Sequence, residues 1–218
     1  RHDINIPFSF STRADFVKED LISKLKSAGC YGIRIGIESA NTFLRETVME
    51  KGLTNKQIIN ASDIIKKHKI NLQFFNILGV HGETLDTALE TYELSYKINP
   101  HHTVCTFINF LPGAKITEIA KEQKIIKNTD NFKNIDCSYF SSLPYDHKYK
   151  KEIINLQRLF QFGNKFRIPG KIMKYLIKFP QNNVFKIIFK INYALGVKKM
   201  SNISWRYIFN LARISKYL

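Results

Sequence analysis

The sequence predicts an α/β fold of parallel strands, organised as a partial (β/α) barrel of the TIM type. Within residues 4–124, short apolar runs alternate with amphipathic stretches of helical period, giving about four strand–helix units. The stretches between successive runs are long enough for the helical crossovers that parallel strands require. An eight-unit barrel takes about 250 residues, so these units supply about half of one.

The second of the first two units places polar residues at the carboxyl end of its strand. Residues 4–12, INIPFSFST, predict the first strand, and the helix after it ends at Gly29, where glycine is preferred. Residues 30–37, CYGIRIGI, predict a second strand. This strand delivers Glu38 and Ser39 to its carboxyl end.

The third unit contains the most distinctive stretch, QFFNILGVHGET at residues 73–84. Its apolar first half predicts a buried strand, Gly79 and Gly82 open the backbone, and Thr84 caps the next helix. On this turn alone, a plain strand–helix connection is as good an interpretation as a ligand-binding turn, because short glycine-spaced patterns are weak fingerprints.

A capped helix precedes this stretch, and a fourth strand follows it. Thr54 and Gln57 have the spacing of a capping box. Residues 103–111, TVCTFINFL, predict the fourth strand, and Pro112 and Gly113 break it. A short helix is expected after the break.

Charge divides the chain. Of its net charge of +16, residues 146–218 contribute 16 Lys and Arg against two acids. We expect a partial barrel at 1–125, an irregular connector at 126–147 and a basic helical extension at 148–218. Trp205 to Leu211 indicate a last helix.

The extension predicts an anionic partner. Lys171, Lys174 and Lys178 would share one helical face, and Lys186 and Lys190 repeat the pattern among Phe and Ile. This combination is typical of a helix on an anionic membrane surface, with nucleic acid the lesser alternative. The other interpretation is that the apolar residues pack on the barrel and the lysines form its solvated face.

Cysteine usage indicates a reducing compartment. Cys30, Cys105 and Cys137 are odd in number and far apart, which argues against a disulfide framework. Cys30 and Cys105 are expected in the core, and His101 and His102 in a solvated loop. With no secretory signal at its start and no apolar run of about 20 residues, the protein is expected in the cytoplasm, peripheral on the inner membrane face if the extension binds lipid.

In a barrel, the carboxyl ends of the strands converge on one mouth. Arg13, Glu38 with Ser39, and the Gly79–Glu83 turn follow three of the predicted strands. A carboxylate can accept hydrogen bonds from a ribose diol, and an arginine can pair with a carboxylate. The set suits a nucleoside that carries an amino-acid tail. The alternative is that Glu38 pairs with a nearby base and Arg13 caps a helix.

Five motifs in order resemble the carboxyl-terminal half of a radical S-adenosylmethionine (SAM) domain. They are TRAD at 12–15, GIES at 36–39, Lys51 with the helix to His68, LGVHGET at 78–84 and FLPGA at 110–114. The spacing is most similar to the class in which a cobalamin-binding domain precedes the barrel. The resemblance implies a six-unit partial barrel in which SAM, bound to a [4Fe-4S] cluster, is cleaved reductively to a radical.

The resemblance also implies a SAM site. Glu38 would lie near the ribose, residues 77–82 and the backbone of 111–113 against the adenine, and Arg13 near the carboxylate. The implied residues are Arg13, Glu38, Ser39, Ile77, Gly79, Gly82, Leu111, Pro112 and Gly113.

The chain departs from the family pattern at three points. The cluster motif C-x-x-x-C-x-x-C is absent, so we expect its thiolates upstream of Arg1. The chain would then be a fragment or a degenerate product, with the missing amino-terminal half as its partner. His81 stands where the family usually has proline. Phe75 stands where some members have glycine, which argues against close backbone approach there.

The leading hypothesis is the SAM-binding half of a cobalamin-dependent methyltransferase-like or cyclase-like radical SAM enzyme. It would use SAM, a [4Fe-4S] cluster, an electron donor and, in full-length form, cobalamin. A methylthiotransferase-like tRNA modifier is the first alternative, although those proteins usually end in a β-rich RNA-binding module. A non-catalytic basic surface binder is the second.

Overall fold

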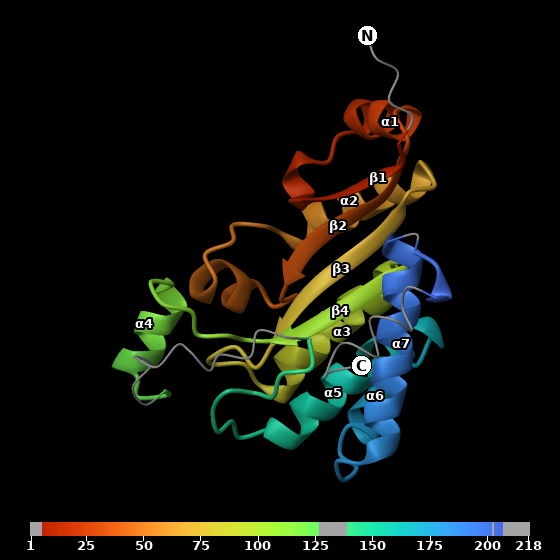
Figure 1. The fold of residues 1–218 in the computed structure, drawn as a ribbon. Helices are drawn as coiled ribbons and strands as arrows, with labels where there is room; N and C mark the ends of the chain where they lie inside the picture. Colours follow the sequence, from red (N-terminus) through yellow and green to blue (C-terminus); the bar gives the residue numbers. More distant parts are fainter. Residues whose placement is uncertain (1–5, 127–138, 202, 207–218) are drawn as a thin grey trace.

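The computed structural model describes residues 6–126, 139–201 and 203–206. Its centre is a parallel sheet in the order β1–β2–β3–β4, which is also the order along the chain. The strands are β1 (Phe8–Thr12), β2 (Cys30–Glu38), β3 (Asn71–Leu78) and β4 (His102–Phe107). The crossovers contain α1 (Glu19–Ser27), α2 (Asn55–Lys67) and α3 (Leu85–Ile98), and α4 (Lys115–Glu122) follows β4. This is the partial barrel that the sequence predicts (Figure 1).

One face of the sheet packs against the crossover helices. Ile33, Ile35 and Ile37 recur at every second position of β2 and are buried in one cluster with Phe74 of β3 and Ile58 of α2. Because side chains alternate across a strand, the residues between them point to the opposite face. In a barrel, that opposite face lines the interior.

Three helices of the basic extension lie at the β4 end of the sheet, away from α1 (Figure 1); the first and the third contact β4, and the second packs on α3 and on the first. They are α5 (Lys150–Lys165), α6 (Gly170–Leu176) and α7 (Asn183–Ser201). On α5, Gln161 Oε1 accepts a hydrogen bond from the backbone N–H of Thr103 at 2.7 Å. Gln157 Nε2 donates to the carbonyl of Cys105 at 3.3 Å. The two glutamines thus bond the edge of β4, where another strand would otherwise pair.

Helix α7 covers part of the inner face near the amino ends of the strands. Met200 packs against Gly32 at the start of β2. Gly196 lies against the ring of His102 at the start of β4, and a Cβ at this glycine would overlap that ring. Burial, helped by the nearby charge of Lys199, lowers the pKa of His102 to about 4. A neutral imidazole is therefore part of the packing between sheet and tail.

Two predictions around β4 are wrong. The strand ends at Phe107 and not at Leu111, because Ile108 N–H donates to the carbonyl of Leu78, the last residue of β3, and beyond it β3 offers no further pairing. His102 lies in the strand, opposite Gln73, and is buried, so it is not a solvated loop residue.

The predicted lysine face in the tail is also wrong in part. Helix α6 ends at Leu176, so Lys178 does not continue the face of Lys171 and Lys174. The helix stops because Asn155 of α5 donates hydrogen bonds to the carbonyls that follow it, Ile177 at 2.9 Å and Phe179 at 2.7 Å. The last predicted helix, residues 205–211, falls almost entirely outside the described residues.

The predicted helix caps are confirmed. Thr54 Oγ1 accepts from Gln57 N–H at 3.2 Å, and the Gln57 side chain accepts from Thr54 N–H at 2.8 Å. Thr84 caps α3 in the same way with Thr87. Gly29 follows α1 with a φ of 96°, in the left-handed region that glycine tolerates best.

Arg45 is buried inside the loop between β2 and α2. Its guanidinium donates to the carbonyl of Ser39 at 2.6 Å, to the carbonyl of Leu53, and to Asn55 Oδ1 at 2.8 Å. The side chain therefore ties the end of β2 to the start of α2 across a π-helical turn, Leu44–Val48.

We expect Arg45→Met to lower the free energy of unfolding by about 3 kcal/mol, because two carbonyls and an amide lose a charged donor inside the protein. Urea unfolding measures the loss. Lys56→Met, at an exposed position of α2, is the matched control and should change stability by less than about 0.5 kcal/mol. Similar losses in both variants would contradict the anchoring role of Arg45.

Candidate functional site

A cavity of about 340 Å³ lies at the carboxyl ends of the strands. It is lined by Glu38 at the end of β2, Ile77 in β3 and Ile108 just after β4, together with the segments 48–51 and 114–116. Small-molecule sites take roughly 300–1,000 Å³, so the cavity has the size of a compact ligand site. Its position agrees with the mouth that the sequence predicts.

Glu38 reaches this cavity through an irregularity in β2. Gly36 lies opposite Phe75 but Glu38 lies opposite Asn76, so β2 has one extra residue at this point. Glu38 also has a φ of 65°, a backbone angle that residues other than glycine rarely adopt. Bulges of this kind redirect a side chain and occur often beside functional sites.

The Glu38 carboxylate forms an ion pair with the ammonium group of Lys51, and each side chain is about one-fifth exposed. Gly36 provides the space, because a Cβ there would overlap both Glu38 Oε1 and Lys51 Nζ. The pairing of Glu38 with a nearby base, which the alternative interpretation expects, is therefore present. The pair still presents a carboxylate at the cavity wall.

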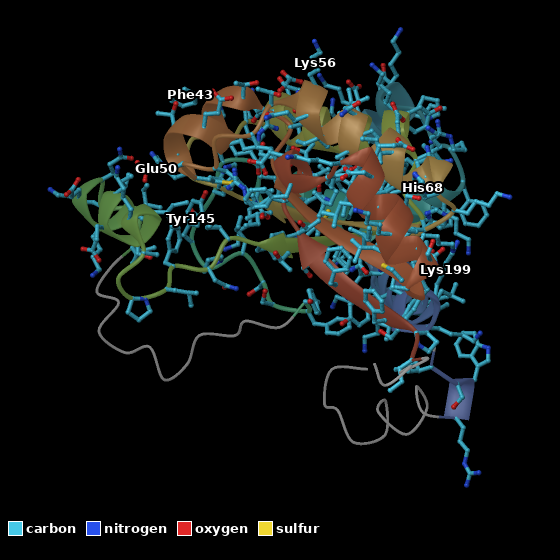
Figure 2. The ribbon with its side chains drawn as sticks, turned by 90° about the horizontal axis from the view of Figure 1, so that it is seen from above. Phe43, Glu50, Lys56, His68, Tyr145 and Lys199 are labelled. Carbon is cyan, nitrogen blue, oxygen red and sulfur yellow. The ribbon has the colours of Figure 1, made fainter. Side chains whose placement is uncertain are left out.

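A second ion pair joins Lys115 of α4 to Glu50, which lies beside α4 (Figure 2). Both residues line the cavity. Each is more than half exposed, so the pair contributes little to stability, but it links α4 to the loop before α2. With Glu38 and Lys51, the lining holds two carboxylates and two ammonium groups among apolar side chains. Such a wall suits a ligand of mixed charge better than a polyanion.

The structure brings only part of the predicted site residues to this cavity. Glu38 and Ile77 line it directly. Residues 111–113 form the turn that leads into Ala114, which also lines it, and Thr117 Oγ1 holds this turn by donating to the carbonyl of Leu111 at 2.6 Å.

Arg13 and Ser39 have other partners. Arg13 donates from Nε and Nη2 to both carboxylate oxygens of Asp15, at 3.0 and 2.9 Å. This pairing lowers the pKa of Asp15 and raises that of Arg13. Ser39 is fully buried, with Oγ 3.4 Å from the hydroxyl of Thr91 on α3. Neither residue lines the cavity.

The glycine turn after β3 is covered. The side chain of Leu143 fills the space where Gly79 would carry a Cβ, and the Tyr145 hydroxyl donates to the Gly79 carbonyl at 3.0 Å. Gly82, with a φ of 81°, is exposed on the far side of the turn. Of residues 77–82, only Ile77 lines the cavity.

Glu83 closes the same turn from inside. It is buried, and Oε2 accepts from Gly79 N–H at 2.5 Å, while Oε1 has no partner among the described residues. Burial raises the pKa of this carboxyl to about 8, although the bonds from the Gly79 and Val80 backbone act in the other direction. In the sequence Glu83 stands out only as the last residue of the Gly79–Glu83 turn, so its burial was not foreseen.

Several cavity residues carry no sequence signal for this role. Lys51 belongs to a recognised motif but had no assigned function, and Glu50, Ile108 and Lys115 belong to none. They meet through the loop before α2 and through the turn into α4. Loop geometry of this kind is not readable from periodicity.

The described residues do not fit an iron–sulfur cluster. Cys30 in β2 and Cys105 in β4 are buried on strands that β3 separates, and burial raises the pKa of both thiols. Cys137 falls outside the described residues. Within the described part of the chain, no group of three or more His, Cys, Asp or Glu could hold a metal ion.

We expect Glu83→Gln to change the pH dependence of stability. The folded chain keeps, up to about pH 8, a proton that the unfolded chain releases near pH 4.5. The unfolding free energy of the wild type should therefore fall as pH rises between these values, by roughly 3–5 kcal/mol at most, whereas Glu83→Gln lacks this loss.

Urea unfolding at about pH 5 and about pH 8 compares wild type, Glu83→Gln and the exposed control Glu122→Gln. The control should follow the wild type. The same change between the two pH values in wild type and Glu83→Gln would rule out a buried, protonated carboxyl.

Comparison with known proteins relates this geometry to a family. Residues 1–95 match the family model of the Radical SAM superfamily. An uncharacterized methyltransferase of Pyrococcus horikoshii is 27% identical over 135 residues, which cover 61% of this chain and 29% of that protein. An uncharacterized protein of Methanocaldococcus jannaschii is 31% identical over 72 residues, which cover 32% of this chain and 20% of that protein. The chain thus spans less than a third of either relative.

Coproporphyrinogen III oxidase (HemN) from Escherichia coli, described as a radical SAM enzyme, has a similar structure. The TM-score is 0.52 at 16% identity, over 73% of this chain and 32% of that chain. At this identity the likeness concerns the fold alone. Residues 1–95 are thus similar in sequence to the Radical SAM superfamily, and the likeness to HemN concerns the parallel α/β fold.

Proposed function

We propose that this chain is the SAM-binding part of a radical SAM enzyme. The observation that carries the proposal is the cavity at the strand ends, where Glu38 and Ile77 line one space. The family match over residues 1–95 supports it. So does the mixed charge of the lining, because SAM combines a sulfonium cation, an amino-acid group and an adenosine.

Each part of the lining has a role in this proposal. Ile77 and Ile108 offer apolar surface to the adenine. The Glu38 carboxylate accepts hydrogen bonds from the ribose hydroxyls, and Lys51 keeps it oriented when no ligand is bound. Arg13 does not line the cavity, whereas Lys51 and Lys115 do, so one of these two lysines is the better candidate for the SAM carboxylate.

The remainder of the enzyme is also proposed. The ligands of a [4Fe-4S] cluster and an electron donor come from outside the described residues. Strands that complete the barrel would pair with the free edge of β1, because among the described strands β1 pairs only with β2. A methyltransferase-like reaction is favoured, because one relative is named a methyltransferase. The sequence resemblance is the support for three further proposals: cobalamin dependence, a cyclase-like reaction and a tRNA methylthiotransferase-like reaction. We propose a cytoplasmic location.

A second proposal concerns the tail: it contacts an anionic membrane surface. On α7, Val184, Ile187 and Ile191 recur at helical spacing and are 61, 55 and 55% exposed. Lys186 and Lys190 lie between them in sequence and are exposed. Exposed branched side chains with flanking lysines fit the headgroup boundary of an anionic leaflet better than they fit nucleic acid. Among the described residues no helix is long and apolar enough to cross a membrane.

Glu38→Gln should weaken binding of SAM or S-adenosylhomocysteine to the 218-residue chain by about 10–100-fold, because a charge-assisted hydrogen bond to the ribose is lost. Calorimetry measures the affinity. Glu118→Gln, at an exposed carboxylate of α4, is the control and should bind as the wild type does. Unchanged affinity in Glu38→Gln, with the fold intact, would remove Glu38 from the site. Absence of binding to the wild type would overturn the proposal for these residues.

Ile187→Asp combined with Ile191→Asp should abolish co-sedimentation with vesicles of phosphatidylglycerol, because carboxylates would enter the leaflet boundary and face its negative charge. The wild type should pellet with these vesicles at low salt, less at high salt, and not with phosphatidylcholine. Lys56→Asp, at an exposed position of α2, changes the net charge by the same amount and is the control, which should pellet as the wild type does. Equal pelleting of the wild type with both lipids, or with neither, would contradict membrane docking.

A further inference from the structure

A second cavity, of about 320 Å³, lies between α5, the first half of α7 and residues 140–142. Arg158 of α5 and Lys186 and Lys190 of α7 line it. It shares no lining residue with the cavity at Glu38. Phe107 lines this cavity and the next residue, Ile108, lines the other, so the end of β4 separates the two.

The charges around this second cavity are all of one sign. Its lining contains one guanidinium group, two ammonium groups and no carboxylate. None of the three cations forms an ion pair with a described residue. By contrast, Lys174 on the neighbouring α6 pairs with Asp86 at 2.7 Å. The cavity therefore gathers three positive charges that no carboxylate of the described residues neutralises.

Arg158 is the central observation. Its Nη1 is buried and has no hydrogen-bond partner among the described residues. Desolvation lowers the pKa of the guanidinium, and no carboxylate is close enough to raise it. A buried charged donor without a partner is costly, and a bound anion removes that cost by accepting its hydrogen bonds.

The cavity also has neutral donors and a fixed wall. Ser141, which is buried, and Gln181 line it with hydroxyl and amide groups. Phe140 and Phe189 form an edge-to-face pair with ring centroids 5.5 Å apart. Gln157 is held by donating to the carbonyls of Cys105 at 3.3 Å and Tyr139 at 3.0 Å. The cations therefore stand on elements that are anchored to the edge of β4.

We propose that this cavity binds the phosphate group of a ligand. A guanidinium group gives two parallel N–H donors to an oxyanion, and ammonium and hydroxyl groups complete the contacts. The volume exceeds that of a bare phosphate, so the aromatic pair would contact the part of the ligand that carries it. The ligand is either a soluble phosphorylated compound or a phospholipid headgroup. This inference does not depend on SAM binding.

Calorimetry with inorganic phosphate and with pyrophosphate, on the 218-residue chain without SAM, tests the proposal. Arg158→Gln should weaken binding at least about tenfold, and Arg158→Lys should restore part of it. Lys186→Gln with Lys190→Gln should weaken binding by a smaller factor. Lys56→Gln, at an exposed lysine of α2 outside the cavity, is the matched control and should leave binding unchanged.

Vesicles distinguish the two sources of phosphate. If pyrophosphate competes with vesicles of phosphatidylglycerol for the wild type, and Arg158→Gln binds neither pyrophosphate nor these vesicles, the cavity binds a headgroup. If only the soluble anions bind, the ligand is a soluble phosphorylated compound. Thermal unfolding of each variant confirms that it is folded. The proposal is overturned if the wild type does not bind phosphate or pyrophosphate, or if Lys56→Gln and Arg158→Gln lose affinity equally.

Discussion

A parallel sheet must be covered on both faces and bonded at its edges, and the rest of this structure follows from that constraint. Helices α1 to α3 cover the outer face with the isoleucines of β2. Part of the inner face is covered by α7, which fits because Gly196 and Gly32 leave room for His102 and Met200. The edge of β4 is bonded by two glutamines of α5. The basic tail is therefore part of the fold, because without it β4 would be open on one edge and one face.

The two cavities lie where this coverage is incomplete, and their charges differ. At the carboxyl ends of the strands, the bulge at Glu38 and the loop held by Arg45 create a wall of alternating charge. Between α5 and α7, Arg158 and its two neighbouring lysines create a wall of uniform positive charge. Opposite charges in a wall can satisfy one another when it is empty, as Glu38 and Lys51 do. A uniformly positive wall has no such internal partner, which agrees with the anion site that we propose there.

In the tail, one helix both packs on the sheet and exposes apolar side chains at the surface. The sequence allowed either a membrane-facing helix or a helix packed on the barrel. Helix α7 packs on the sheet with one side, through Met200 and Gly196, and exposes Val184, Ile187 and Ile191 on another. Packing is thus established, and membrane contact stays a prediction that concerns the exposed side only.

The sequence by itself determined the elements and their order, because strand runs, capping boxes and the glycine after α1 depend only on residues that are close together in the chain. It also brought out Glu38 at the end of a predicted strand, while Ile77 came from the resemblance to the radical SAM family. Only the tertiary structure decided which residues share a cavity. Lys51 lies in a loop whose path depends on buried Arg45, and Lys115 begins α4, whose position depends on the turn before it. Leu143 covers Gly79 because a distant segment folds over the turn. Such contacts join residues far apart in the chain, and no local pattern specifies them.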